Sequence, residues 1–207
     1  MRTQTIVLSA LMLLLSACAA PVKEQAQSGF LRDYSRLEKV DDQRYLFVSD
    51  KLANYDQYTI APIAMLVEFD DPSESFTEEE LDELKAYFVQ TLSEALSKGD
   101  NGYKVASGPG EGVIRYRMGI TALDKSVGAL NLSIYTKITG AGLGGLAIEM
   151  EAIDSLTGEQ LAATVRWGNG SRILRAGYTK AGDAKILIKR WSKDARSDWD
   201  RARGIKD

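Results

Sequence analysis

Cys18 is the only cysteine in the chain and carries its most reactive side chain. A thiol becomes a nucleophile or a metal ligand when it loses its proton, and enzymes commonly use a nearby histidine for this step. The sequence contains no histidine, so it can form neither a Cys-His pair nor a Ser-His-Asp triad. A single cysteine also cannot close a disulfide within the chain. Cys18 therefore needs a different explanation.

The residues before this cysteine have the features of a secretory signal peptide. Arg2 supplies a positive charge, and residues 6–15 are almost entirely apolar. Such a segment is too short to span a bilayer, which requires about 20 apolar residues. The small residues Ser16 and Ala17 follow, as a cleavage site requires. We expect residues 1–17 to be a cleaved signal peptide.

The stretch Leu15-Ser16-Ala17-Cys18 resembles the lipobox of bacterial lipoproteins. The resemblance implies that the signal peptidase recognises Leu15, Ser16 and Ala17 and cleaves before Cys18. It also implies a diacylglyceryl group on the sulfur and a further acyl chain, such as palmitate, on the new amino group. Two or three chains make a firm anchor, because each buried methylene contributes about 0.8 kcal/mol. Ala19 favours the outer membrane. The alternative is an ordinary signal peptide with an incidental cysteine.

The composition narrows the chemistry further. Lys and Arg number 26 against 29 Asp and Glu, for a net charge of -3, so the chain has no overall attraction for nucleic acid. Without histidine, zinc, copper and iron sites are disfavoured, and a metal would have to be calcium or magnesium on oxygen ligands. We find no P-loop, G-x-S-x-G, S-x-x-K or C-x-x-C motif. We expect no enzymatic activity, metal or cofactor.

Two loops contain weak matches to known sites. Gly140, Gly142 and Gly145 match G-x-G-x-x-G, but the run leads into a predicted strand, whereas a dinucleotide loop leads into a helix. We predict a loop between strands, which could also contact a partner or a membrane. Asp70, Asp71, Ser73 and Glu74 could offer oxygens to calcium, but they lack the EF-hand spacing and are predicted to form a solvated loop.

Two groups of charged residues could also form sites. Glu149 and Glu151 share one strand face, and Arg115 and Arg117 share another, so cross-strand ion pairs are expected if these strands are neighbours. The alternative is a carboxylate pair of the kind that glycoside hydrolases use. The last helix combines basic and acidic residues, which predicts a solvated face or, alternatively, contact with anionic headgroups or lipopolysaccharide. These residues are Lys189, Arg190, Lys193 and Arg196, with Asp194, Asp198 and Asp200.

The sequence predicts two helices, which form part of the scaffold for these charged residues. Residues 77–98 form the clearer one, with a T-x-x-E capping box at Thr77 and Glu80 and with Gly99 at the end. Residues 182–202 form the other, whose apolar stripe includes Trp191 and Trp199 as core residues. These two tryptophans are better explained by the core than by a ligand platform. Residues 30–40 have weak helical spacing at Phe30, Tyr34 and Leu37.

Several segments are predicted to be strands. Residues 58–69 are an apolar run with Pro62, which indicates an edge position or a bulge. Residues 113–124 alternate between apolar and polar positions, which indicates one buried and one solvated face. A hairpin follows, in which Leu146, Ile148, Met150 and Ala152 face the core while Glu149 and Glu151 face out. Its turn is D-S-L-T-G-E at 154–159, and Leu161, Ala163, Val165 and Trp167 return along the core face.

The order of these elements predicts an α+β fold, a mostly antiparallel sheet with two main helices packed on one face. We expect a signal peptide at 1–17, a flexible tether at 18–29 and a single periplasmic α+β domain at 30–207.

Three segments resemble one family of bacterial lipoproteins, known as domain of unknown function 3313. They are FLRDYSRLEKV, NYDQYTIAPI and AIEMEAIDSLTGEQLAATV. The resemblance implies a secreted, lipid-anchored α+β domain and supplies no activity or catalytic residues. A weaker topological likeness connects the chain to TolB N-terminal and curli-secretion lipoprotein domains, which suggests partners in envelope assembly.

Together these features predict a non-enzymatic lipoprotein of the outer membrane, anchored by its lipid and facing the periplasm. It would bind or scaffold another envelope component. A periplasmic module for a small ligand or lipid is the alternative, and a hydrolase that uses carboxylates alone is a third. The identity of the partner and the oligomeric state stay open.

Overall fold

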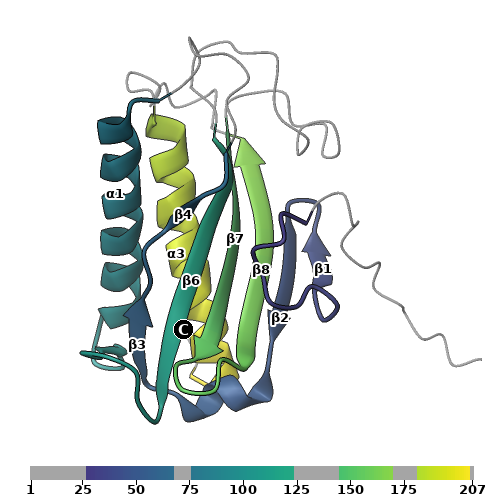
Figure 1. The fold of residues 1–207 in the computed structure, drawn as a ribbon. Helices are drawn as coiled ribbons and strands as arrows, with labels where there is room; N and C mark the ends of the chain where they lie inside the picture. The colour runs from purple at the N-terminus through teal and green to yellow at the C-terminus, as the bar shows by residue number, and fades with distance from the viewer. Residues whose placement is uncertain (1–26, 68–75, 124–144, 170–180, 206–207) are drawn as a thin grey trace, which may run out of the picture.

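The structure is a computed structural model that describes residues 27–67, 76–123, 145–169 and 181–205. It contains one eight-stranded sheet, two long helices and a short 3-10 helix at Asp50–Asn54 (Figure 1). The helices are α1 (Glu78–Ser97) and α3 (Gly182–Ala202). The strands are β1 (Glu38–Asp41), β2 (Arg44–Val48), β3 (Gln57–Ile60), β4 (Ala64–Met65), β5 (Lys104–Val105), β6 (Val113–Leu123), β7 (Gly145–Asp154) and β8 (Gln160–Asn169).

The sheet is built around three long antiparallel strands. β7 lies between β6 and β8, and β2 and β1 extend the sheet from β8 in antiparallel pairs. On the other side, β3 and β4 run parallel to β6, and β5 runs parallel to β3. The sheet is therefore mixed but mostly antiparallel, which confirms the predicted α+β class.

Local sequence signals account for the ends of α1. The Thr77 hydroxyl accepts from the Glu80 N–H at 3.2 Å, and the Glu80 carboxylate accepts from the Thr77 N–H at 2.9 Å. This is the predicted capping box, and it satisfies two donors that the helix leaves free. Gly99 follows the last turn with a φ of 79°, a conformation that glycine adopts easily.

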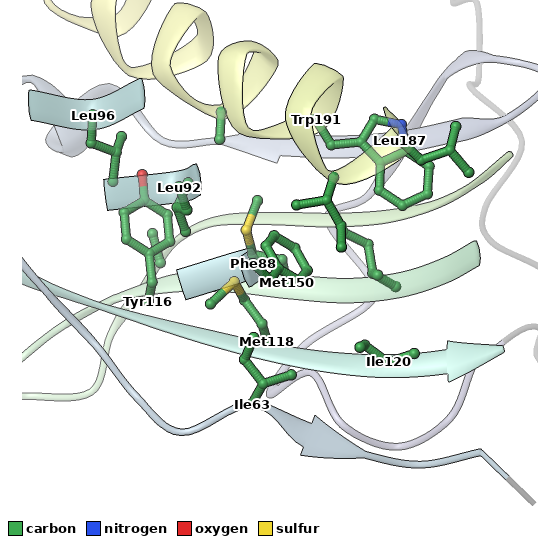
Figure 2. Close-up of a cluster of buried hydrophobic side chains, with 14 of the residues drawn as sticks. Ile63, Phe88, Leu92, Leu96, Tyr116, Met118, Ile120, Met150, Leu187 and Trp191 are labelled. Carbon is green, nitrogen blue, oxygen red and sulfur yellow. The ribbon is translucent and has the colours of Figure 1, made fainter. Parts of the chain in front are cut away.

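The two helices cover one face of the sheet (Figure 1). Figure 2 shows side chains of both helices meeting those of β6 and β7 in one apolar core. Each large side chain that is fully buried here contributes about 1.5–3 kcal/mol to stability. The core side chains labelled in the figure are Phe88, Leu92 and Leu96 from α1, Leu187 and Trp191 from α3, Tyr116, Met118, Ile120 and Met150 from the sheet, and Ile63 from the segment between β3 and β4.

The opposite face is covered as well, by the segment of residues 27–37, which we call the strap. Leu31 and Leu37 of the strap are buried against Ala147 and Val165 of the sheet. The prediction of a solvated second face is therefore wrong over most of the long strands, although Arg115 of β6 remains exposed. Where the strap lies, both faces are buried, so alternating strand residues enter two separate cores.

Two further predictions are corrected. Residues 30–37 are not helical, because several strap N–H groups donate to side chains of the strap and the sheet where a helix would use backbone carbonyls. Ala163, Val165 and Trp167 belong to the strap side, whereas Leu161 belongs to the helix side. An irregularity in the β7–β8 register between Ala152 and Ile153 explains this change of face.

Within the described part of the apolar run at 58–69, which ends at residue 67, two short strands form, β3 and β4. Pro62 lies between them and cannot donate to the ladder, which accounts for the interruption. Backbone bonds resume on either side, from Ala61 N–H to the Tyr116 carbonyl and from Leu66 N–H to the Ile120 carbonyl. Across the described ranges, no helix combines the length and apolar character that a membrane span needs.

Candidate functional site: buried carboxylates beneath the strap

Glu149 and Glu151 are the most deeply buried charged side chains that the structure describes. They occupy alternate positions of β7 on the strap side, with exposed fractions of 0% and 1%. They were predicted to face solvent, because alternation along a strand distinguishes two faces without showing what covers each. A buried carboxylate is costly unless donors surround it, so their partners determine what this site can do.

Glu149 binds the strap directly. One carboxylate oxygen accepts the Ser28 N–H at 2.9 Å, and the other accepts the Tyr34 hydroxyl. Burial, together with the hydrogen bond to Glu149, raises the pKa of Tyr34 to about 12, so this hydroxyl remains a donor. The Tyr34 oxygen also accepts the Leu31 N–H at 3.2 Å. The backbone N–H groups of Ser28 and Leu31 thus donate to the side chains of Glu149 and Tyr34. In a helix such groups would donate to backbone carbonyls.

Glu151 joins the strap to two strands. It accepts the Arg32 N–H at 3.0 Å and the Gln160 side-chain amide of β8 at 2.8 Å. Its other oxygen pairs with the Arg117 guanidinium of β6, the residue directly opposite in the register. This confirms the expected cross-strand ion pair for Arg117, whereas Arg115 is exposed and lies opposite Ile153.

The Phe30 ring of the strap also packs against two residues of β6. The Arg117 guanidinium lies 4.9 Å from the centre of the Phe30 ring, a cation–π arrangement. The same ring lies over Gly119 of β6, where an added Cβ would come within 3.2 Å of the ring carbon Cγ. Glycine at this position therefore lets the strap approach the sheet closely.

This arrangement is suited to structure more than to catalysis. Each of the four carboxylate oxygens accepts a hydrogen bond, and the strap covers both side chains. A hydrolytic pair needs one carboxylate that can reach substrate and another that can reach water or the substrate. Glu149 and Glu151 can do neither while the strap is in place.

Several predicted site residues lie outside the described residues. They include the proposed lipidation site Cys18 and its recognition residues Leu15, Ser16 and Ala17. The possible calcium ligands at 70–74 and the glycines at 140–144 are also outside, and Gly145 begins β7. Ser28 and Gly29, assigned to the tether, are described: Ser28 is bound to Glu149, as above.

The charged residues of α3 do not form one solvated face. Lys189, Arg190 and Lys193 are exposed, but Arg196 reaches across to the end of α1. Its guanidinium donates to the carbonyls of Leu96 at 2.7 Å, of Lys98 at 3.0 Å and of Asn101 at 3.0 Å. α1 has no basic residue in its own last turn, so Arg196 supplies the cation that the helix C-terminus favours.

The aspartates of α3 are also engaged. Asp200 accepts the Tyr103 hydroxyl at 2.7 Å and the Arg196 guanidinium at 2.6 Å. Asp198 pairs with Arg44 of β2, and burial raises the pKa of Asp198 above its usual range. Sequence analysis missed these pairs. The only feature of the sequence that pointed to these pairs was the position of the aspartates beside the apolar stripe of the helix.

The tryptophans of α3 lie in the core, as predicted. Trp191 and Trp199 are 1% and 0% exposed, and Trp199 stacks on Tyr103 with ring centres 3.6 Å apart. A cavity beside Trp199, between the sheet and α3, has a volume of about 30 Å³. That space holds a water molecule or two and is far too small for a lipid chain.

Comparisons with solved structures show distant likenesses of fold. PelC from Paraburkholderia phytofirmans, a dodecamer in two crystal forms, is 14% and 13% identical with TM-scores of 0.46 and 0.44. These alignments cover 74% and 72% of this chain and 95% and 96% of PelC. A Xanthomonas campestris protein of the DUF330 family is 10% identical over 72% of this chain and 85% of its own, with a TM-score of 0.43.

The family assignment rests on the sequence. No curated protein matches the chain. A family model described as "Protein of unknown function (DUF3313)" matches residues 26–195, which include the strap, all the strands and most of α3. The match confirms the resemblance seen in the sequence, and this chain belongs to the DUF3313 family.

Proposed function

We propose that this chain is a non-enzymatic lipoprotein of the outer membrane that faces the periplasm and binds or scaffolds another envelope component. The lipobox-like residues 15–18 supply the predicted anchor. The observation that carries the proposal is the attachment of the strap, in which two fully buried carboxylates bind Ser28, at the end of the predicted tether, and Arg32, which follows it. Glu149 and Glu151, the carboxylates considered above for a hydrolase, instead attach the strap to the sheet.

The strap determines how far the domain can stand from the bilayer. The ten residues from Cys18 to Gln27 can extend at most about 33–36 Å. The chain is attached to the sheet from Ser28 onward, so this attachment point would remain within that distance of the acyl chains. A short attachment of this kind suits a protein that presents a binding surface at the membrane.

Replacement of the anchor residue tests the membrane assignment. We expect Cys18→Ser to release the protein from membranes or to leave it uncleaved, because serine has no thiol to accept the diacylglyceryl group. Fractionation of cells, with the mass of the purified chain, measures both outcomes. A serine variant that still appears in the outer membrane in mature form contradicts the proposed anchor.

The binding role needs a separate experiment. Crosslinking in intact cells, followed by purification in mild detergent, should recover a specific envelope component with the wild-type protein. Recovery of the lipoprotein alone under several mild conditions contradicts the binding role and leaves the anchor untouched.

A further inference from the structure

A groove lies between the two helices, which run in the same direction. Lys185 near the start of α3 lies over Tyr87 of α1, and Arg196 near its end binds Leu96 of α1. Each helix contributes one stripe of residues spaced by three or four, so that the stripes face each other across the groove. We call this the α1–α3 groove. The residues used below are Thr91 and Glu94 of α1, Lys98 directly after α1, and Lys189, Lys193 and Arg196 of α3.

The groove is large enough for a small ligand. Its volume is about 490 Å³, within the range of roughly 300–1,000 Å³ that is usual for ligand sites. It is therefore distinct from the water-sized cavity beside Trp199.

Three lysines give the groove its charge. Within the described ranges, Lys98, Lys189 and Lys193 have no carboxylate partner and no aromatic ring beneath them. Four of the other five described lysines do have such partners: Lys39, Lys51 and Lys85 pair with carboxylates, and Lys185 lies over Tyr87, whereas Lys104 of β5 is exposed without one.

The acidic groups of the groove are already bound. Glu94 accepts the Gln90 side-chain amide at 2.7 Å. Asp200 is occupied by Tyr103 and Arg196, as described above. Glu94 keeps its negative charge, whereas Asp200 is paired with Arg196. The four basic side chains of the groove therefore exceed its two acidic ones, and the three lysines remain available to an incoming anion.

Arg196 also binds the negative C-terminal end of α1, which lies close to Lys98. The C-terminus of a helix is its negative end and would repel an anion close to Lys98. Arg196 covers carbonyl oxygens of this end, including those of Leu96 and Lys98. The guanidinium thus satisfies acceptors at the helix end, in addition to its pair with Asp200, so that fewer free carbonyl oxygens lie close to Lys98.

We propose that the α1–α3 groove binds a phosphate-bearing ligand through Lys98, Lys189 and Lys193. An ammonium group is a compact point charge, and lysine commonly binds phosphate in this way. Thr91 adds a hydroxyl donor at the same groove. The phosphate could belong to a lipid headgroup or to a free phosphate ester. The inference rests on the proposed binding role and deepens it by naming the ligand chemistry.

The test uses the full mature lipoprotein in a non-ionic detergent. In one arm, calorimetry measures the affinity for glycerol 3-phosphate. In the other, phosphatidylglycerol or phosphatidylcholine is added to the micelles, and native mass spectrometry counts retained lipid. The test variant is Lys189→Gln with Lys193→Gln. The matched control is Lys39→Gln with Lys51→Gln, which removes the same charge from exposed lysines outside the groove.

We expect binding in at least one arm, with a loss of about ten-fold or more in the groove variant and less than about three-fold in the control. Binding of glycerol 3-phosphate alone identifies a free phosphate ester, and preference for phosphatidylglycerol identifies a headgroup. Absence of binding in both arms, or equal losses in the two variants, overturns the proposal. Because the experiment includes no partner and no membrane fractionation, its failure is distinguishable from failure of the proposed function.

Discussion

Single side chains determine whether the strap stays on the sheet. Glu151 is fully buried, and its oxygens have donors from the strap, β6 and β8. A buried ion pair contributes little compared with an apolar pair, but removal of one partner leaves the other charge uncompensated. The partner is Arg117, whose side chain is 29% exposed, so that water relieves part of this cost.

We therefore expect Glu151→Gln to lower the free energy of unfolding by about 2–4 kcal/mol. Glutamine keeps the shape and still accepts the Arg32 N–H, but it cannot neutralise Arg117. Urea denaturation measures the change. Glu159→Gln is the control, because its pair with Lys51 is exposed and should contribute less than about 1 kcal/mol. Equal effects of the two substitutions would show that burial does not matter here.

Asp154 makes the stability depend on pH. The Thr157 N–H and the Tyr55 hydroxyl lower the pKa of Asp154 from 3.8 to about 2. The folded state thus favours the carboxylate, and this stabilisation is complete above about pH 4 and lost as the pH falls towards 2. Because the side chain is partly exposed, the expected contribution is about 1 kcal/mol.

Asp154→Asn should therefore reduce the difference in unfolding free energy between about pH 5 and about pH 2.5 by this amount. Urea denaturation at the two pH values measures it. Asp100→Asn, at an exposed carboxylate with no hydrogen-bond partner among the described residues, should leave the difference unchanged. An undiminished acid response in Asp154→Asn would contradict the assignment.

At the scale of elements, the two helices depend on each other. α1 begins with its own capping box but relies on α3 at its other end, through Arg196. An arginine can serve several carbonyls at once because its donors are spread over a rigid plane. The packing of α3 therefore determines how well the last turn of α1 is held.

Arg196→Lys keeps the charge and removes this geometry. We expect the free energy of unfolding to fall by about 1–2 kcal/mol, because one ammonium group cannot reach all the carbonyls of Leu96, Lys98 and Asn101. Arg190→Lys, on the exposed face of the same helix, should change it by less than about 0.5 kcal/mol. Thermal and urea denaturation measure both, and indistinguishable variants would exclude the capping role.

At the scale of the whole molecule, the two cores share the same strands. Met150 of β7 enters the helix-side core, whereas its neighbours Glu149 and Glu151 are buried beneath the strap. Loss of either layer would expose one face of β6, β7 and β8 to water. The strap and the helices should therefore be lost together.

We expect one cooperative unfolding transition. Tryptophan fluorescence reports on both layers, since Trp191 and Trp199 lie on the helix side and Trp167 on the strap side. Its urea midpoint should coincide with that from far-UV circular dichroism. A Trp167→Phe variant keeps only the helix-side signal, and within that variant the fluorescence and circular dichroism midpoints should again coincide. An earlier loss of the strap-side signal would contradict the single-domain prediction.

Local patterns in the sequence were enough to locate the elements that have a capping or turn motif at their ends or a clear apolar periodicity. The capping box at Thr77, the turn at 154–159 and the stripe of α3 each depend on residues a few positions apart, so short-range physics determines them. The signal peptide at 1–17, predicted from residue type and spacing, and the anchor that the lipobox resemblance at 15–18 implies lie outside the described residues and stay predictions.

Only the tertiary structure determined that Glu149 and Glu151 are buried and which residues they bind. Their strap partners Ser28 and Arg32 lie 121 and 119 positions away in the chain, so no local pattern could connect them. Alternation in β7 separates two faces, but only the folded chain shows that the strap covers the second one. The same holds for the α1–α3 groove, since its lysines come from helices that the sequence predicts separately and that only packing brings together.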